Sequence, residues 1–167
     1  LYLAEGSYAG ANWSPPGNGT APIRICGRGR GNVIVTGNLT VTNGSGIEFE
    51  RINFSGGAEL TGGSSITFNN CRFFGNAGGL SVTDHTGLGV SHCVFDDVTV
   101  QLTRSSGTFI SGNIFSKAEG AALITDTADA VGYADYNAYR SDTQCWQVNN
   151  TDRSFAYVQQ DLHHENY

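Results

Sequence analysis

One segment of the sequence, from Ile47 to Phe115, repeats the same pattern four times. Each copy alternates apolar and polar residues, shifts phase by one position and closes on a phenylalanine. The copies read IEFERINF, ITFNNCRF, LGVSHCVF and TFISGNIF, and their closing phenylalanines are 19, 22 and 20 positions apart. A period near 20 indicates an array of stacked repeats. Because alternation with period two is the spacing of a β-strand, each copy predicts two short strands joined by a bend.

A third apolar patch recurs after each copy at a near-constant interval. The patches are Leu39/Val41, Leu60, Leu80/Val82, Val100/Leu102 and Leu123/Ile124. Three short strands per repeat, with Gly, Asn, Ser and Thr between them, are typical of one coil of a parallel β-helix, whose stacked coils share a core. We therefore predict an all-β solenoid of about six coils of roughly 19–23 residues, spaced about 4.8 Å apart.

The same pattern predicts a single β-helix domain over residues 1–167. Residues 1–36 form irregular first coils, because Pro and Gly interrupt the alternation there. Residues 37–130 form the regular coils, and residues 131–167 form a closing segment.

Aligning the copies predicts which side chains stack inside the rod. The closing phenylalanines should form one ladder, and the residues two positions before them should form a second, namely Ile52, Cys71, Cys93 and Asn113. The two cysteines should be buried free thiols that point inward side by side. Cys26 and Cys145 lie in the first and last coils, too far apart to pair with each other. Asn113, the polar member, should bond to backbone or to a stacked neighbour.

Composition narrows the classes of partner. The 167 residues include 15 acidic and 9 basic residues, a formal net charge of −6, which argues against nucleic acid and anionic membranes. No apolar run approaches the roughly 18 residues of a membrane span. The sequence starts at Leu1 without Met or an apolar leader, so we expect a mature or excised piece. Zinc-binding Cys/His spacings are absent, and we predict no cofactor and no metal site.

Several stretches resemble one known group of proteins. They are LYLAEGSYAG, PIRICGRG, ITFNNCRFFGN, TFISGNIFSK and YADYNAYR, with Trp146 and Asp161-Leu-His163 beyond the last. Together they resemble the secreted right-handed β-helix proteins of the pectate-lyase-like superfamily, nearest the alginate-lyase and chondroitinase-B-like branch. This resemblance covers nearly the whole chain. It implies a right-handed coil, an extracellular or cell-surface location and sugars bound along an outer groove.

The resemblance also suggests where catalysis would take place. Lyase chemistry needs a base near the C5 proton of the sugar and a cation that stabilises the developing charge. In the family these are a Lys and an Arg about one coil apart, and the matching positions here are Asp84 and Thr103/Arg104. The candidate catalytic residues are therefore Asp84, its neighbour His85 and Arg104, expected together on one outer face. Asp84 stands where the family has Lys, which argues against a lyase.

Three further residues are candidates for carbohydrate binding. They are Asp96 and Asp97, which follow a closing phenylalanine at a coil corner, and Trp13. A glycosidase needs two carboxylates that converge on one sugar, whereas Asp at a turn is also ordinary turn chemistry.

Two hypotheses of function follow. The first is an extracellular structural β-helix with a glycan-contacting outer face, which stacks end to end into fibres with copies of itself through open strand edges. The stacking residues would be Leu1, Leu3, Ile23, Ile25, Tyr133, Tyr136, Trp146 and Phe155. The alternative is a carbohydrate-active enzyme, a polysaccharide lyase or glycosidase, or a fragment of one; a non-catalytic glycan-binding module is a third possibility. The mismatch at Asp84 favours a protein that is not an enzyme.

Overall fold

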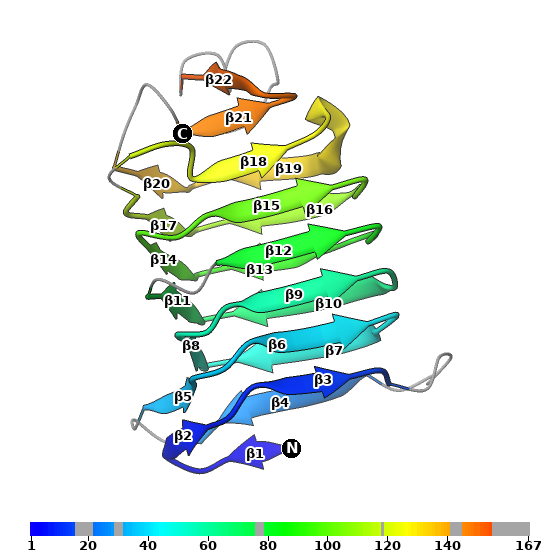
Figure 1. Cartoon of the computed structure of the whole chain (residues 1–167), viewed down its shortest axis with the longest axis vertical. Helices are drawn as coiled ribbons and strands as arrows, with labels where there is room; N and C mark the ends of the chain where they lie inside the picture. The colour runs from blue at the N-terminus through cyan, green and yellow to red at the C-terminus, as the bar shows by residue number, and fades with distance from the viewer. Residues whose placement is uncertain (16–21, 29–31, 76–78, 118, 141–144, 155–167) are drawn as a thin grey trace.

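The chain winds into a rod of three β-sheets in a computed structural model (Figure 1), and all their strand pairings are parallel except the last one of the third sheet. The structure describes residues 1–15, 22–28, 32–75, 79–117, 119–140 and 145–154. Each coil contributes one strand to each sheet in turn, so that neighbouring strands in a sheet come from successive coils. The sheets, named A, B and C here, contain seven, seven and eight strands. The predicted all-β solenoid of about six coils is confirmed.

The strands of each sheet follow in chain order. Sheet A contains β1 (Tyr2–Leu3), β4 (Ile23–Gly27), β7 (Ser45–Glu50), β10 (Ser64–Asn69), β13 (Gly89–Ser91), β16 (Thr108–Ser111) and β19 (Val131–Asp135). Sheet B contains β2 (Gly6–Tyr8), β5 (Val33–Val35), β8 (Asn53–Phe54), β11 (Arg72–Phe74), β14 (Val94–Asp96), β17 (Ile114–Phe115) and β20 (Ala138–Tyr139). Sheet C contains β3 (Ala11–Trp13), β6 (Leu39–Thr42), β9 (Ala58–Thr61), β12 (Leu80–Thr83), β15 (Val100–Thr103), β18 (Leu123–Thr125), β21 (Trp146–Val148) and β22 (Thr151–Arg153). One 3₁₀ turn, η1 (Ala128–Ala130), precedes β19.

The predicted phenylalanine ladder is confirmed. Phe54, Phe73, Phe95 and Phe115 occupy one row of sheet B and are at most 1% exposed. Their rings stack face to face with centroids 4.9 to 5.0 Å apart, and Tyr139 continues the column at 5.0 Å. The ring spacing matches the distance between paired strands. The core is therefore periodic along the rod because each coil places the same side chain one strand spacing further on.

A single residue makes the bend between sheets A and B in each regular coil. Arg51, Asn70, His92 and Tyr136 adopt φ between 51° and 57° at this bend, and Gly112 adopts 68°. One left-handed residue turns the chain and shifts the alternation by one position, which is the phase slip visible in the sequence. The next residue then points inward, and these residues are Ile52, Cys71, Cys93, Asn113 and Asn137, all buried.

The second predicted ladder is also confirmed, and it ends in two asparagines. The side-chain oxygen of Asn113 accepts a bond from the Cys93 backbone N–H at 2.8 Å, while its amide group donates to the Val90 carbonyl at 3.0 Å. The amide of Asn113 also donates to the side-chain oxygen of Asn137 at 2.9 Å. Both buried amides thus bond to backbone and to each other, as buried polar groups generally do. All four cysteines are buried and free, which confirms the prediction for Cys71 and Cys93 and agrees with the expectation that Cys26 and Cys145 do not pair.

The two ends of the rod compare differently with the stacking prediction. At the N-terminal coil Leu1 and Tyr2 are 73% and 68% exposed, as stacking would require. At the C-terminal coil, however, the expectation for Trp146 is wrong, because its ring is fully buried and its Nε1 donates to Thr125 Oγ1 at 3.1 Å. Strand β22 pairs antiparallel with β21 and covers that edge of sheet C. Phe155 and the Asp161–His163 segment lie outside the described residues. In the described part of the chain, no helix is long and apolar enough to span a membrane.

Candidate functional site

A groove of about 770 Å³ runs along the corner where sheet B passes into sheet C. It spans residues from Thr36 to Lys117 and therefore crosses several successive coils. Five glycines line it, among them Gly56 and Gly79. A Cβ at Gly79 would collide with the Thr99 carbonyl of the next coil, and one at Gly56 would collide with Gly37 of the preceding coil. Glycine is needed because the backbones touch here, and the missing side chains leave the corner hollow.

Polar side chains from the second positions of three sheet C strands face this groove. Glu59, Ser81 and Gln101 lie in one row along the rod, each paired with the next in register. All three are exposed, and Asn38 beside them donates from its amide to Glu59 Oε2 at 3.3 Å. A carboxylate that accepts hydrogen bonds, a hydroxyl that donates and accepts them, and an amide that does both thus follow one another at one strand spacing, about 4.8 Å.

Asp97 and Lys117 complete the polar lining of the groove. Asp97 was a candidate from the sequence, and the structure brings it to the same groove as Glu59. Two carboxylates and the only lysine of the sequence therefore line one cleft. Such a surface can accept bonds from hydroxyl groups, donate bonds to them and neutralise a single negative charge.

Asp96 lies outside the groove although it precedes Asp97. It forms an ion pair with Arg72 and accepts a bond from Ser116 Oγ at 3.0 Å. Arg72 belongs to sheet B one coil earlier, and its guanidinium also lies over the Phe74 ring at 4.8 Å. The hydrogen bonds from Arg72 and then from Ser116 lower the pKa of Asp96. Its carboxylate is thus occupied on the outer face of sheet B.

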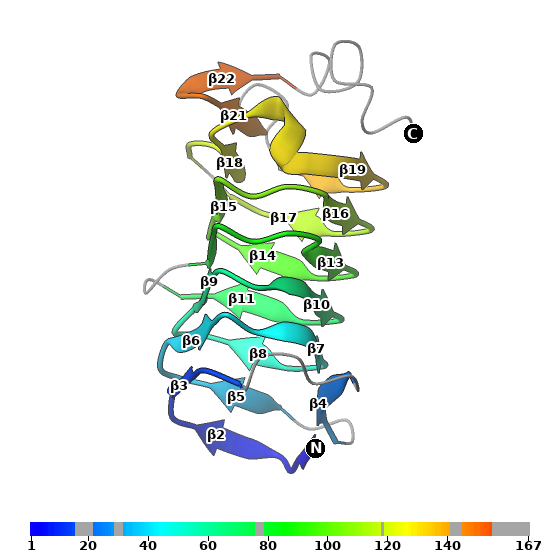
Figure 2. The same ribbon diagram turned by 90° about the vertical axis from the view of Figure 1, so that its right-hand side faces the viewer.

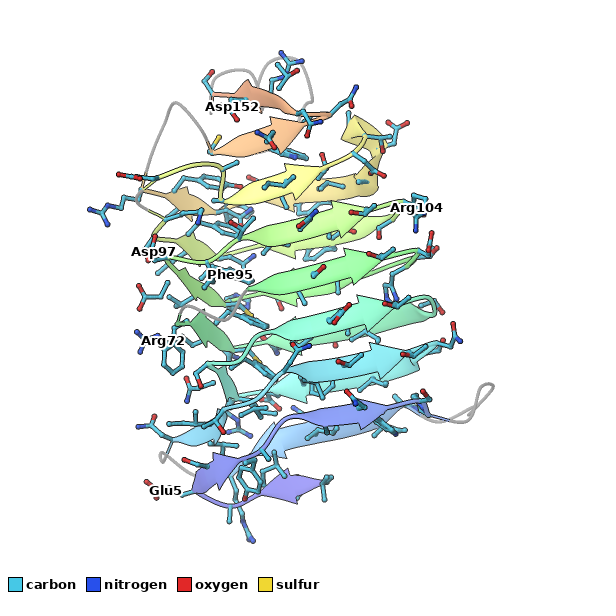
Figure 3. All side chains as sticks on the ribbon, viewed as in Figure 1. Glu5, Arg72, Phe95, Asp97, Arg104 and Asp152 are labelled. Carbon is cyan, nitrogen blue, oxygen red and sulfur yellow. The ribbon has the colours of Figure 1, made fainter. Side chains whose placement is uncertain are left out.

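Asp84 and Arg104 meet on the outer surface as predicted, at the far ends of the sheet C strands. Figure 3 shows Arg104 and Asp97 on opposite sides of sheet C. The Arg104 guanidinium donates two hydrogen bonds to the Asp84 carboxylate, at 2.7 and 2.8 Å. The bonds from Arg104 lower the pKa of Asp84. The Arg104 backbone N–H bonds to Asp126 Oδ2 at 2.6 Å. The ion pair between Arg104 and Asp84 links two neighbouring coils at the corner between sheets C and A.

The prediction that His85 shares this outer face is wrong. Asp84 adopts φ of 55°, and this left-handed residue shifts the alternation so that His85 points into the rod, where it is 1% exposed. Its Nδ1 lies 2.9 Å from the Gly62 carbonyl oxygen of the preceding coil. Burial lowers the pKa of His85, because the charged imidazolium loses its hydration.

A pH dependence of stability follows from this buried histidine. In the unfolded chain His85 titrates near its ordinary pKa of about 6.5, whereas in the folded chain its pKa is lower. The unfolded state thus binds more protons below about pH 7, and the free energy of unfolding falls as the pH drops through that range. Between pH 7.5 and pH 5.5 we expect the free energy of unfolding, measured with urea, to fall less in His85→Gln than in the native chain.

His92→Gln is the matched control, because His92 is exposed on the outside of the rod. It should lose as much stability on acidification as the native chain. Protonation of carboxylates changes the free energy of unfolding in a lower pH range, since Asp and Glu ordinarily titrate near pH 4. Equal acid sensitivity of the native chain and His85→Gln would contradict the assignment.

Trp13 does not reach the groove. It pairs with Val41 in sheet C, at an inward position, and its partly buried ring packs against the core. The groove instead contains Glu59, Gln101 and Lys117, which the sequence did not single out as site residues. The sequence does contain a signal for this row. Glu59, Ser81 and Gln101 each follow the first inward residue of a sheet C strand, so aligning those strands places the three in one outward row.

Comparison with known proteins identifies the architecture. A family model described as "Right handed beta helix region" matches residues 12–142, most of the 167-residue chain. No curated protein and no solved structure matches the chain.

Proposed function

Because the chain belongs to the right-handed β-helix family, we propose that it binds an extended carbohydrate in the groove along sheet C. The observation that carries the proposal is the repeating polar row of Glu59, Ser81 and Gln101 at the edge of a hollow that crosses several coils. A polysaccharide laid along the rod would meet a hydroxyl, amide or carboxylate partner on each coil. The proposal carries with it an extracellular or cell-surface location, where such polymers occur.

The character of the groove favours hydroxyl-rich ligands. Its polar side chains are two amides, three hydroxyls, two carboxylates and one amine, and each of these groups forms hydrogen bonds with sugar hydroxyls. The two acidic groups outnumber Lys117, so a neutral polymer suits the groove better than a polyuronate.

Binding is favoured over lyase chemistry by the positions of the basic groups. Proton abstraction would need a base and a cation at one sugar. Arg104 is held by Asp84 at the far ends of the sheet C strands, whereas Lys117 lies at the groove by their starts. The two groups therefore do not converge. Glycoside hydrolysis is a second candidate, because Glu59 and Asp97 are two carboxylates in the same cleft.

The test of the proposal uses a panel of hexasaccharides, including cellohexaose, xylohexaose and hexagalacturonate, titrated by calorimetry. We expect the double variant Glu59→Ala/Gln101→Ala to bind its ligand about 5- to 150-fold more weakly, because it loses two hydrogen bonds of about 0.5–1.5 kcal/mol each. Asn12→Ala is the control. Asn12 lies in the same outward row as Glu59 but two coils earlier, outside the lining of the groove.

The same samples distinguish the candidates. Binding without new reducing ends supports a non-catalytic site. Reducing ends that disappear in Glu59→Gln and Asp97→Asn would assign hydrolysis instead. Failure of the whole panel to bind, or unchanged affinity in the double variant, would refute the groove proposal.

End-to-end stacking stays a prediction beside this proposal. The exposed Leu1 and Tyr2 favour it at the N-terminal coil, whereas the burial of Trp146 removes one of its expected contacts at the other end.

A further inference from the structure

Two aromatic rings stack on the outer face of sheet A, in contact with solvent. Phe109 on β16 and Tyr133 on β19 have ring centroids 4.8 Å apart and planes only 9° from parallel. They are 45% and 38% exposed. Their spacing equals the distance between neighbouring strands, so the column runs along the rod and each ring has one face turned away from its partner.

The free face of Phe109 is turned toward a position in the same row that has no side chain of its own. Gly89 on β13 pairs with Phe109, and Thr67 on β10 pairs with Gly89. Gly89 contributes no side chain, and the three atoms nearest to a Cβ placed there all belong to Thr67. Thr67 and Phe109 are two strand spacings apart, about 9.6 Å. This interval, named the Gly89 slot here, can hold one ring stacked on Phe109.

Neutral polar groups border the Gly89 slot on both sides. One neighbouring row of sheet A contains Asn69, Ser91 and Ser111, paired in register. On the other side Thr86 and Ser106 form a bridge at the start of the same coils. Among the described residues of these rows from β10 to β16, the side chains are hydroxyls and one amide, with Phe109 and no charge.

An apolar ring face bordered by hydroxyl and amide groups matches the chemistry of a pyranose. One face of such a sugar presents C–H groups, which pack on an aromatic ring, and its rim presents hydroxyls, which bond to Ser, Thr and Asn side chains. An uncharged border favours a neutral sugar, since a uronate carboxylate would lose hydration without a cation to pair with.

We propose that the Gly89 slot is a second carbohydrate site, which holds a neutral pyranose stacked on Phe109. Sheets A and C face opposite ways, with sheet C toward the viewer in Figure 1 and the two sheets on opposite sides in Figure 2. A rod with sugar sites on both faces holds two polysaccharide chains at once and links them. The slot does not depend on the groove, because it is built from other strands.

The experiment is made in the groove variant Glu59→Ala/Gln101→Ala, in which the groove binds its ligand more weakly and the sheet A site contributes most of the binding. Cellohexaose, xylohexaose and mannohexaose are the probes, with hexagalacturonate as the acidic comparison, and binding is followed by calorimetry and by the backbone amide signal of Gly89. We expect at least one neutral hexasaccharide to bind and to shift that signal. Phe109→Thr removes the stacking face, and Gly89→Thr fills the slot; each should weaken binding at least about tenfold.

Gly89→Thr forces the Thr67 side chain to shift, because the Thr67 methyl would lie 2.8 Å from the new Cβ; Phe109→Thr, which shortens a side chain, tests the slot without this demand. Ile114→Thr is the control, since Ile114 is 51% exposed on sheet B and its loss should leave affinity unchanged. Absence of neutral-sugar binding in the groove variant overturns the proposal, as does equal affinity of Phe109→Thr. A dimer in sedimentation that Phe109→Thr dissociates would also overturn it, because the rings would then contact a second copy.

Discussion

Replacement of Phe95 by alanine lowers the free energy of unfolding by about 3–5 kcal/mol, the usual loss for a fully buried phenylalanine. The Phe95 ring has no solvent exposure and stacks between Phe73 and Phe115, with centroids 5.0 and 4.9 Å away. Truncation leaves a cavity in the middle of the column. The rod closes such a cavity poorly, because the paired strands on both sides hold the neighbouring rings one strand spacing away.

Urea denaturation at neutral pH measures this loss. The matched control is Phe109→Ala, which also removes a phenylalanine stacked on one neighbouring ring, but on the outer face where it is 45% exposed. We expect the control to cost about 1 kcal/mol or less, the contribution of an exposed aromatic pair. Losses of equal size in the two variants would show that the column is not the core.

Replacement of Asn113 by leucine should lower the free energy of unfolding by about 3 kcal/mol, because a buried polar group left without a partner costs about 1–3 kcal/mol. The variant leaves the Cys93 N–H and the Val90 carbonyl without their side-chain partner. It also removes the bond to Asn137, which lies in the same ladder one coil on. Leucine fills the space but satisfies none of these groups.

Cys71→Val is the control for Asn113→Leu, measured by the same urea titration. Cys71 occupies the equivalent inward position two coils earlier, where the neighbouring residue in the ladder is Ile52. An apolar side chain is thus already accepted there, and a volume-conserving change should cost less than about 1.5 kcal/mol. If Asn113→Leu is as mild as Cys71→Val, the hydrogen bonds of Asn113 do not stabilise the fold.

Much of the fold could be predicted because the repeat fixes the register. Once Phe54, Phe73 and Phe95 are aligned, the strand residues between them have an assigned coil and face. The phase slip before Cys71 and Cys93 locates the bend, and the structure shows its cause as one left-handed residue, Asn70 or His92.

A left-handed residue also explains why the direction of His85 could not be predicted from the sequence. Its inward direction depends on the backbone angle of Asp84, and aspartate adopts left-handed angles only in some turns. A glycine at that position, as at Gly62 in the preceding coil, is a clearer signal of positive φ. Trp146 pairs in register with Leu123 and so continues an inward row; its exposure was mispredicted because the strand that covers this edge, β22, folds back antiparallel on β21 and is not part of the repeat.

The groove was hidden for another reason. It exists where side chains are missing, at Gly56 and Gly79, and where Glu59, Ser81 and Gln101 meet across coils that are about 20 residues apart in the chain. Neither feature is visible in any single segment of sequence. The Gly89 slot was hidden for the same reason, since it exists only because Gly89 lies beside Phe109 of the next coil.

The in-register stacking also determines how such a chain can change in length. Phe68 and Val90 are partners in adjacent coils of sheet A, so excising residues 68–89 would join Thr67 to Val90 and leave every remaining strand with an equivalent neighbour. Loss of one residue inside a strand would instead turn the following side chains to the opposite face. Insertions and deletions are therefore tolerated in units of a whole coil. Any binding surface along the rod is correspondingly lengthened or shortened by one coil at a time, with the chemistry of its other coils unchanged.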